Sequence, residues 1–176
     1  PKVTVHSHQL RVDIKAEQLL RNLFSHVLRN AIDHGIEMPE ERVELGKSAS
    51  GEIVIQLAVE GNNVLMHVSD DGRGVNIAAL RKKGIAIGLF DVAESLSPDA
   101  LAQLIFASGV STKEKVTDIS GRGVGMDAVK QFVADKGGGI HIKLLQEDTM
   151  ISRDYIPFEL VITLPGQYFV QVPCSV

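Results

Sequence analysis

The chain has 176 residues, of which 44% are hydrophobic and 23% are charged. This length suits one hydrophobic core and is short for two, so we expect a single domain over residues 1–176. The formal net charge of −4 shows no basic surplus, which argues against a nucleic-acid-binding protein. The lone Cys174 leaves no disulfide framework or cysteine metal site within the chain.

No apolar run approaches the roughly 18 residues that a membrane-spanning helix needs, so we expect no contact with a membrane. The N-terminal residues Pro1–Val5 show neither a starting Met nor the apolar segment of a signal peptide. We therefore expect a piece of a longer chain, and a cytoplasmic location.

The first expected elements are an edge strand and a long helix. Val3 and Val5 alternate with polar residues near the N-terminus, a pattern typical of a strand. Between Lys15 and Asp33 the apolar residues recur three and four positions apart, which predicts an amphipathic helix. Gly35 follows as a helix stop.

The remaining chain predicts a hairpin, two glycine turns and two closing strands. Residues 52–60 and 64–69 are β-rich and flank a Gly-Asn turn, as in a β-hairpin. Residues 77–120 show little periodicity beyond a helical pattern at 98–106. A helix from Met126 and strands at 140–145 and 158–164 follow. We predict an α+β fold, a two-layer sandwich with helices on one face of a mixed, mostly antiparallel sheet.

The first candidate site lies on the long helix. Asn22, His26 and Asn30 are spaced four apart and share a helix face, and Asp33 and His34 follow them. An asparagine oxygen can ligate Mg²⁺ beside phosphate oxygens, and a histidine can donate to a phosphate or move a proton. The alternative is a solvated polar helix face.

The second candidate is the Asp70-Asp-Gly72-Arg-Gly74 sequence directly after a strand. A carboxylate at a strand end can accept a hydrogen bond from an exocyclic amine such as adenine N6, and the glycines let backbone approach a flat ring. The alternative is an ordinary Asp-Gly turn.

The third candidate is Gly121-x-Gly123-x-Gly125, which opens a helix. Backbone amides at such a helix N-terminus form a phosphate site. The sequence lacks the Gly-Lys-Ser/Thr ending of a P-loop and the preceding strand and later acid of a dinucleotide fold. Together the three candidates favour a nucleotide site.

These sequences resemble the boxes of the GHKL ATPases, the superfamily of gyrase, heat-shock chaperone, histidine kinase and mismatch-repair ATPases. Residues 30–37 resemble the asparagine box, 70–74 the first glycine box and 121–127 the second. The strings 26–37 and 111–127 are similar to those of chemotaxis histidine kinases nearly word for word. The resemblance covers about residues 10–165, the expected superfamily core, followed by a short tail, 166–176.

The resemblance implies roles for individual residues. Asn30 would ligate the Mg²⁺ that bridges the ATP phosphates, with the catalytic candidates His26 and His34 near those phosphates. Asp70 would accept the adenine amino hydrogen. The remaining implied nucleotide-binding residues are Asp33, Gly72, Gly74, Ser111, Thr112, Gly121, Gly123, Gly125, Met126 and Thr163, and the segment of about 107–120 would be the ATP lid.

The resemblance implies a kinase catalytic domain that binds ATP and Mg²⁺ and phosphorylates a histidine on another domain, in cis or in trans. An aspartate of a response regulator would then take the phosphate. Water-activating members carry a glutamate where this chain has His26, and a carboxylate there can act as a general base. His26 therefore disfavours a freestanding ATPase.

Two features depart from the family pattern. The usual Gly-x-Gly-Thr before the last strand is replaced by Tyr155-Ile-Pro-Phe158, after the extra residues 146–154, and a lid phenylalanine is replaced by Val110. The altered wall favours an alternative in which the chain is a degenerate regulatory module that binds nucleotide without transferring phosphate.

Overall fold

The computed structural model of the chain describes residues 1–7, 10–110, 125–145 and 155–171. A central sheet has five strands in the order β1-β3-β4-β8-β6. β1 runs parallel to β3, and the other neighbours pair antiparallel. The strand bounds are β1 Lys2–His6, β3 Glu52–Glu60, β4 Asn63–Asp70, β8 Phe158–Pro165 and β6 Gly139–Leu144. The predicted mixed, mostly antiparallel sheet is confirmed, as are its central hairpin and its edge strand.

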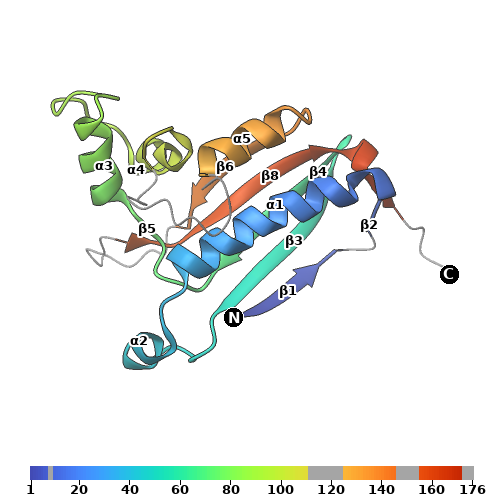
Figure 1. The fold of residues 1–176 in the computed structure, drawn as a ribbon, viewed down its shortest axis with the longest axis horizontal. Helices are drawn as coiled ribbons and strands as arrows, with labels where there is room; N and C mark the ends of the chain where they lie inside the picture. The colour runs from blue at the N-terminus through green and yellow to red at the C-terminus, as the bar shows by residue number, and fades with distance from the viewer. Residues whose placement is uncertain (8–9, 111–124, 146–154, 172–176) are drawn as a thin grey trace, which may run out of the picture.

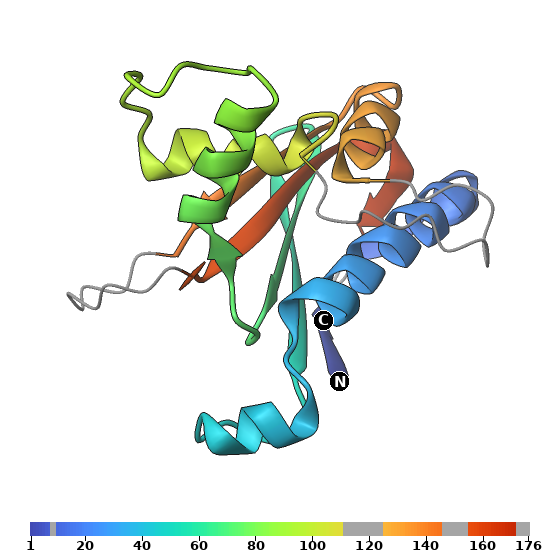
Figure 2. The same cartoon turned by 60° about the vertical axis from the view of Figure 1, so that its left-hand side comes forward.

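Helices lie on one face of this sheet, as predicted (Figure 1). The long helix α1 covers Glu17–Asn30, and α5 covers Met126–Ala134. The other helical elements are η1 Ile14–Ala16, η2 Ala31–Gly35, α2 Pro39–Glu44, α3 Ile77–Ala86, α4 Pro98–Ala102, η3 Gln103–Phe106 and η4 Gly166–Tyr168. In both views α2 stands apart from the helices that cover the sheet (Figure 2).

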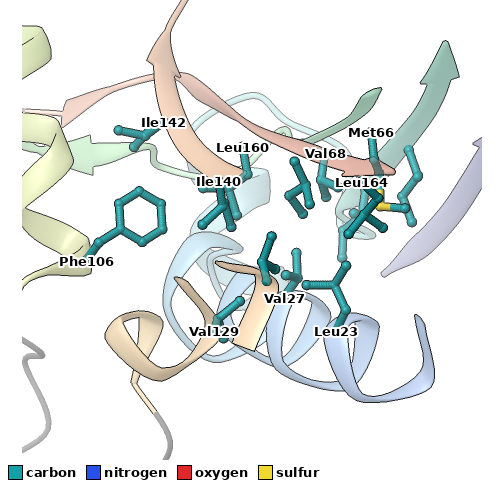
Figure 3. Packing of buried hydrophobic residues seen from close by; sticks show 14 of the residues in the cluster. Leu23, Val27, Met66, Val68, Phe106, Val129, Ile140, Ile142, Leu160 and Leu164 are labelled. Atoms are coloured by element: carbon teal, nitrogen blue, oxygen red, sulfur yellow. The ribbon is translucent and has the colours of Figure 1, made fainter. Parts of the chain in front are cut away.

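The hydrophobic core lies between the helices and the sheet. In β4 the side chains of Val64, Met66 and Val68 are buried, and those between them are partly exposed. Figure 3 shows Leu23 and Val27 of α1 on the side of the core opposite Met66 and Leu164. Each such buried side chain stabilises the fold by roughly 1.5–3 kcal/mol, so this contact fixes α1 on the sheet.

Two short strand pairs join segments that are distant in sequence. β2 (Leu10–Val12) pairs with β9 (Phe169–Gln171), and β5 (Val75–Asn76) pairs with β7 (Tyr155–Ile156), both antiparallel. β1 and β9 lie outside the expected core of about 10–165, yet both are paired. The folded part of the chain therefore extends beyond the region that carries the family resemblance.

Two helices differ from the sequence-based expectation. Residues 77–86 form helix α3 although they show weak periodicity. Gly84 of this helix leaves room for the Phe90 ring, because a Cβ at position 84 would lie 2.4 Å from Cε1 of Phe90. The short helix α2 begins at Pro39, which occupies its first turn. No helix within the described parts of the chain is long and apolar enough to cross a membrane.

Candidate functional site

Asp70 ends strand β4 and begins the first glycine turn, defined here as residues 70–74. Its register partner on β3 is the buried Ile53, so Asp70 falls on the helix-covered face of the sheet. The amide N–H of Gly72 donates to Asp70 Oδ1 over 3.0 Å. The turn therefore holds the carboxylate through its own backbone.

The first glycine turn packs against backbone on two sides. A Cβ at position 72 would lie 2.2 Å from the carbonyl oxygen of Gly35, and one at position 74 would lie 2.4 Å from that of Ile156. Gly74 also has a φ of +84°, which favours glycine. The Arg73 amide donates to the same Gly35 carbonyl over 2.9 Å. Both predicted glycines are thus required by close backbone approach.

Gly35 adds a third place where a side chain would not fit. A Cβ there would lie 2.9 Å from Asp70 Oδ1, so the missing side chain gives the carboxylate its space. The sequence identified Gly35 only as a helix stop. Its position beside Asp70 depends on the packing of α1 over β4, which local sequence does not encode.

Burial raises the pKa of Asp70 above its ordinary value. The hydrogen bond from Gly72 opposes this shift, and the neighbouring charges of Asp71 and Glu37 add to it. A desolvated carboxylate gains more from a hydrogen-bond donor than an exposed one does. Asp70 is therefore suited to accept a hydrogen bond from a ligand amine.

Beside this turn lies an ion cluster made of Glu37, Arg42, Lys47 and Asp71. Arg42 is fully buried, and it pairs with Glu37 Oε2 at 3.0 Å and with Asp71 Oδ2 at 2.7 Å. Lys47 Nζ pairs with Glu37 Oε1 at 2.7 Å. Burial alone would raise the pKa values of Glu37 and Asp71, but hydrogen bonds and the two cations hold both below their ordinary values.

The predicted polar helix face lies at the C-terminal end of α1. His26 and Asn30 are partly buried, whereas Asp33 and His34 are exposed. After Asn30 the helix widens into the π-turn η2, in which the Ile36 amide donates to the Ala31 carbonyl. Such turns are frequent at functional sites. Here the turn carries Asp33 and His34 and ends at Gly35, beside Asp70.

Helix α5 meets this end of α1. The Asn30 amide nitrogen lies 2.8 Å from the sulfur of Met126, so two residues that are 96 positions apart come together. Gly125 is the N-cap of α5, and the helix begins with Met126. The first amides of a helix attract anions, and Met126, the first residue of α5, contacts the Asn30 side chain through its sulfur. This end of the site, where Met126 contacts Asn30, carries the predicted phosphate contacts Asn30 and Gly125 and is named the phosphate end for that prediction.

The structure places Thr163 away from Asp70. Thr163 pairs with Leu65 of β4 and Gly139 of β6, five positions along β4 from Asp70. Its strand neighbours Ile162 and Leu164 point into the core, so Thr163 faces the opposite side of the sheet from the helices. The expectation that Thr163 points at a base is wrong for this geometry.

Other predicted site residues lie outside the described residues: Ser111, Thr112, Gly121 and Gly123. Of the expected lid, the structure describes residues 107–110, which form a turn with Val110 buried against the core. Val110, which stands where a phenylalanine was expected, therefore packs as a core residue.

The Tyr155–Phe158 segment forms a wall of the first glycine turn. Tyr155 and Ile156 pair with Asn76 and Val75 just after the turn, and the Pro157 carbonyl accepts from the Leu145 amide. The departure from Gly-x-Gly-Thr thus replaces a glycine loop by a short strand pair against Gly74.

Comparison with known proteins agrees with this arrangement. A family described as "Histidine kinase-, DNA gyrase B-, and HSP90-like ATPase" matches residues 15–165. The chain therefore belongs to this family of ATPases. The match spans α1, the first glycine turn and α5, which are the elements that build the site.

Within this family the chain is similar to chemotaxis proteins. It is 42% identical over 138 residues to chemotaxis protein CheA of Salmonella typhimurium, covering 78% of this chain and 20% of that protein. CheA of Bacillus subtilis is 40% identical over 139 residues, with 78% and 21% covered. The gliding motility regulatory protein of Myxococcus xanthus is 42% identical over 125 residues, with 70% and 16% covered. The chain thus spans about a fifth of these relatives.

A solved structure shares the fold. The mycobacterial sensor histidine kinase MprB aligns with a TM-score of 0.53 and 18% identity, covering 94% of this chain and 83% of that one. At this identity the likeness concerns the fold alone. The predicted two-layer α/β sandwich of the GHKL ATPases is confirmed.

Proposed function

We propose that the chain is the ATP-binding catalytic domain of a chemotaxis-type histidine kinase. The observation that carries the proposal is the partly buried Asp70 carboxylate, held against Gly35 by a glycine turn in a chain of the ATPase family. The similarity to CheA proteins supports the chemotaxis class.

The base would lie against the first glycine turn. Asp70 would accept the adenine amino hydrogen, and the flat ring would lie against the backbone of the turn that Gly72 and Gly74 allow to form. Met126 would contact the same nucleotide from α5. The raised pKa of Asp70 means that its ionised form gains most from a donor placed beside it.

The phosphates and Mg²⁺ would lie at the phosphate end. Asn30 carries an amide oxygen, a ligand type that Mg²⁺ accepts beside phosphate oxygens and water. When bound, Mg²⁺ would neutralise charge on the phosphates. No group of three or more His, Cys, Asp or Glu side chains suited to a metal occurs within the described ranges, so Asn30 would act together with the nucleotide's own oxygens.

Asp33, Gly125 and the two histidines complete the proposed site. The α5 amides beyond Gly125 would donate to the phosphates, and His26 and His34 would lie beside them on the face that carries Asn30. Ser111, Thr112, Gly121 and Gly123 remain predicted phosphate contacts from outside the described residues. Because position 26 holds histidine in place of a carboxylate, the site is suited to positioning and charge neutralisation for phosphoryl transfer.

The acceptor would be a histidine on another domain, in cis or in trans, and a response-regulator aspartate would take the phosphate from it. The chain spans about a fifth of its CheA relatives, so this partner belongs to the proposal for the whole protein. The proposed location is the cytoplasm, where ATP is supplied.

The test begins with calorimetric titration of the chain with ATP and ADP, with and without Mg²⁺. We expect micromolar-to-millimolar affinity that responds to Mg²⁺, and loss of binding in Asp70→Asn. A histidine-bearing acceptor domain from a CheA relative is then added with labelled ATP. We expect label on the acceptor and little free phosphate. His26→Ala should reduce transfer more than binding.

Three other outcomes would change the assignment. Nucleotide binding without transfer to any acceptor would favour a regulatory module, for which the Tyr155–Phe158 wall is the structural argument. Steady phosphate release that Asn30→Ala abolishes would indicate a freestanding ATPase. Absence of nucleotide binding would contradict the proposal altogether.

A further inference from the structure

Arg42 is the largest fully buried side chain among the described residues, although it belongs to the short outlying helix α2. A buried guanidinium is costly unless every donor has a partner. Arg42 donates to the Ser48 carbonyl at 2.6 Å, to Glu37 at 3.0 Å and to Asp71 Oδ2 at 2.7 Å. The guanidinium therefore links α2 and the segment after it to the first glycine turn.

The Lys47 side chain binds the backbone of the same turn. Its ammonium donates to the carbonyls of Asp71 at 2.9 Å and Gly72 at 3.0 Å, and to Glu37 at 2.7 Å. Carbonyl orientation fixes the peptide planes of a turn. Gly72 is the residue whose N–H holds Asp70 Oδ1, so the peptide planes that Lys47 orients also set the position of Asp70.

The carboxylates of this region outnumber its cations by one. The three carboxylates Glu37, Asp70 and Asp71 face two cations, Arg42 and Lys47. The cations pair with Glu37 and Asp71, and Asp70 makes no ion pair with a described residue. One negative charge therefore has no cation paired with it among the described residues, and it is that of Asp70, whose Oδ1 accepts from the Gly72 amide. That charge is left for a ligand donor.

We propose that Arg42 and Lys47, oriented by Glu37, are positioning residues that fix the first glycine turn and thereby its selectivity for a base bearing an amine at C6. The inference rests on the proposed nucleotide site, and it assigns the selectivity to side chains outside the three nucleotide boxes. Neither cation touches the base. Lys47 acts through the carbonyls of Asp71 and Gly72, and Arg42 acts through the Asp71 carboxylate.

A neighbouring ion pair provides a matched control. Arg73 pairs with Glu41 at 3.2 Å, and both side chains are exposed. This pair joins the same helix α2 to the same turn, but it involves no carbonyl of the turn and no buried group. Exposed pairs contribute little. Glu41→Gln should therefore leave both folding and nucleotide selectivity unchanged.

The test compares ADP with inosine diphosphate, which carries a carbonyl in place of the C6 amine. Calorimetry gives both affinities for the parent chain, Lys47→Met, Lys47→Gln and Glu41→Gln. In Lys47→Met we expect ADP to bind about tenfold more weakly, as a modest misplacement of a positioned group would cause, with inosine diphosphate nearly unchanged. Lys47→Gln keeps hydrogen-bond donors for the carbonyls, so its ADP affinity should lie between those of the parent and Lys47→Met.

A spectroscopic readout separates positioning from stability. In ¹⁵N-labelled protein without nucleotide, the Gly72 amide resonance should shift in Lys47→Met and stay in place in Glu41→Gln. Thermal unfolding confirms that each variant is folded. A general loss of stability would weaken both nucleotides equally and would leave their ratio unchanged.

The possible outcomes separate the two proposals. A parent chain that binds neither nucleotide would overturn the proposed function, and this inference with it. A parent that prefers ADP, with folded Lys47→Met and Lys47→Gln variants that keep its ADP affinity, selectivity and Gly72 resonance, would overturn the positioning role alone. A parallel drop of both nucleotides in the lysine variants would also overturn it.

Discussion

The two ends of the candidate site are built differently. The first glycine turn is held by the Gly35 carbonyl, the ion cluster and the β5–β7 pair. At the phosphate end, the described contact between α1 and α5 side chains is that of Asn30 with Met126, and Ser108 donates to Asp127 at 2.8 Å nearby. One end is fixed by backbone and buried charge, the other by helix packing.

This difference indicates that the two ends of the site serve different tasks, base selectivity and phosphate binding. A base is a rigid planar group, and selectivity for it requires donors and acceptors placed in advance. Phosphates with Mg²⁺ can be held by charge and by helix amides, which tolerate small displacements. Substitutions in the backbone and the ion cluster that hold the first glycine turn should therefore affect stability and selectivity together, whereas those at Asp70 or at the phosphate end should act mainly on ligand binding.

The largest effect is expected for Arg42→Met. Removing one partner of a buried ion cluster leaves Glu37 without its buried counter-charge, and this typically costs about 3–5 kcal/mol. Urea unfolding measures the change. Glu41→Gln, which breaks the exposed pair with Arg73, should stay within about 0.5 kcal/mol of the parent. A loss of less than about 1 kcal/mol in the free energy of unfolding for Arg42→Met would contradict the claim that buried charge holds the first glycine turn.

Asp70→Asn comes next, and its effect should fall on binding. Loss of a hydrogen bond to a charged acceptor costs about 1.5–3 kcal/mol, so calorimetry should give ADP affinity reduced about tenfold to a hundredfold. Stability should be unchanged or higher. The raised pKa of Asp70 means that its ionised form opposes folding at neutral pH, and asparagine removes that charge.

The same shift predicts a pH dependence of binding. As the pH falls through the raised pKa of Asp70, the carboxylate gains a proton and can no longer accept the amine hydrogen without competition. ADP affinity of the parent should therefore decline at a higher pH than an ordinary aspartate would give, while that of Asp70→Asn stays flat. Equal pH profiles for the two proteins would contradict the role of Asp70.

Gly72→Ala tests the close backbone approach at the turn. The added Cβ would lie 2.2 Å from the Gly35 carbonyl oxygen, so the turn must shift, at a cost of roughly 1–3 kcal/mol for overpacking. Gly139→Ala is the matched control because nothing lies within 4 Å of a Cβ there. Urea unfolding should separate the two variants. Equal stability would show that the turn yields easily.

Asn30→Ala tests the phosphate end, where we expect an effect on ligand binding and little effect on stability. Asn30 is partly buried and its described partner is Met126, so stability should change by no more than about 0.5 kcal/mol. The increase in ATP affinity on adding Mg²⁺ should disappear, because the proposed ligand oxygen is lost. Calorimetry with and without Mg²⁺ tests this, and a retained Mg²⁺ effect would contradict the assignment.

The smallest effect concerns acid sensitivity of the fold. Glu37 and Asp71 have lowered pKa values in the folded state, so their contribution to stability is present above their ordinary pKa values. It is lost as the pH falls through the lowered ones. Stability measured by urea between neutral and acid pH should therefore fall less steeply in Glu37→Gln than in the parent. An unchanged slope of stability against pH would contradict a lowered pKa of Glu37 in the folded state.

The sequence by itself determined the sheet hairpin, the long helix and the glycine turn at residues 70–74, whose contacts with a nucleotide stay a prediction. Alternation in residues 52–69 predicts β3 and β4 because the side-chain period of a strand is two. Asp70, Gly72 and Gly74 were found because they follow a strand directly. These signals are local, so they survive without knowledge of the fold.

Only the tertiary structure decided what surrounds those residues. It placed Gly35 against Asp70, brought Met126 to Asn30 and gathered Glu37, Arg42 and Lys47 beneath the turn. It also placed the Thr163 side chain on the sheet face opposite the helices, because successive side chains of a strand point to opposite faces. The contacts that surround these residues join positions up to 96 apart in the chain, and no local pattern in the sequence carries that information.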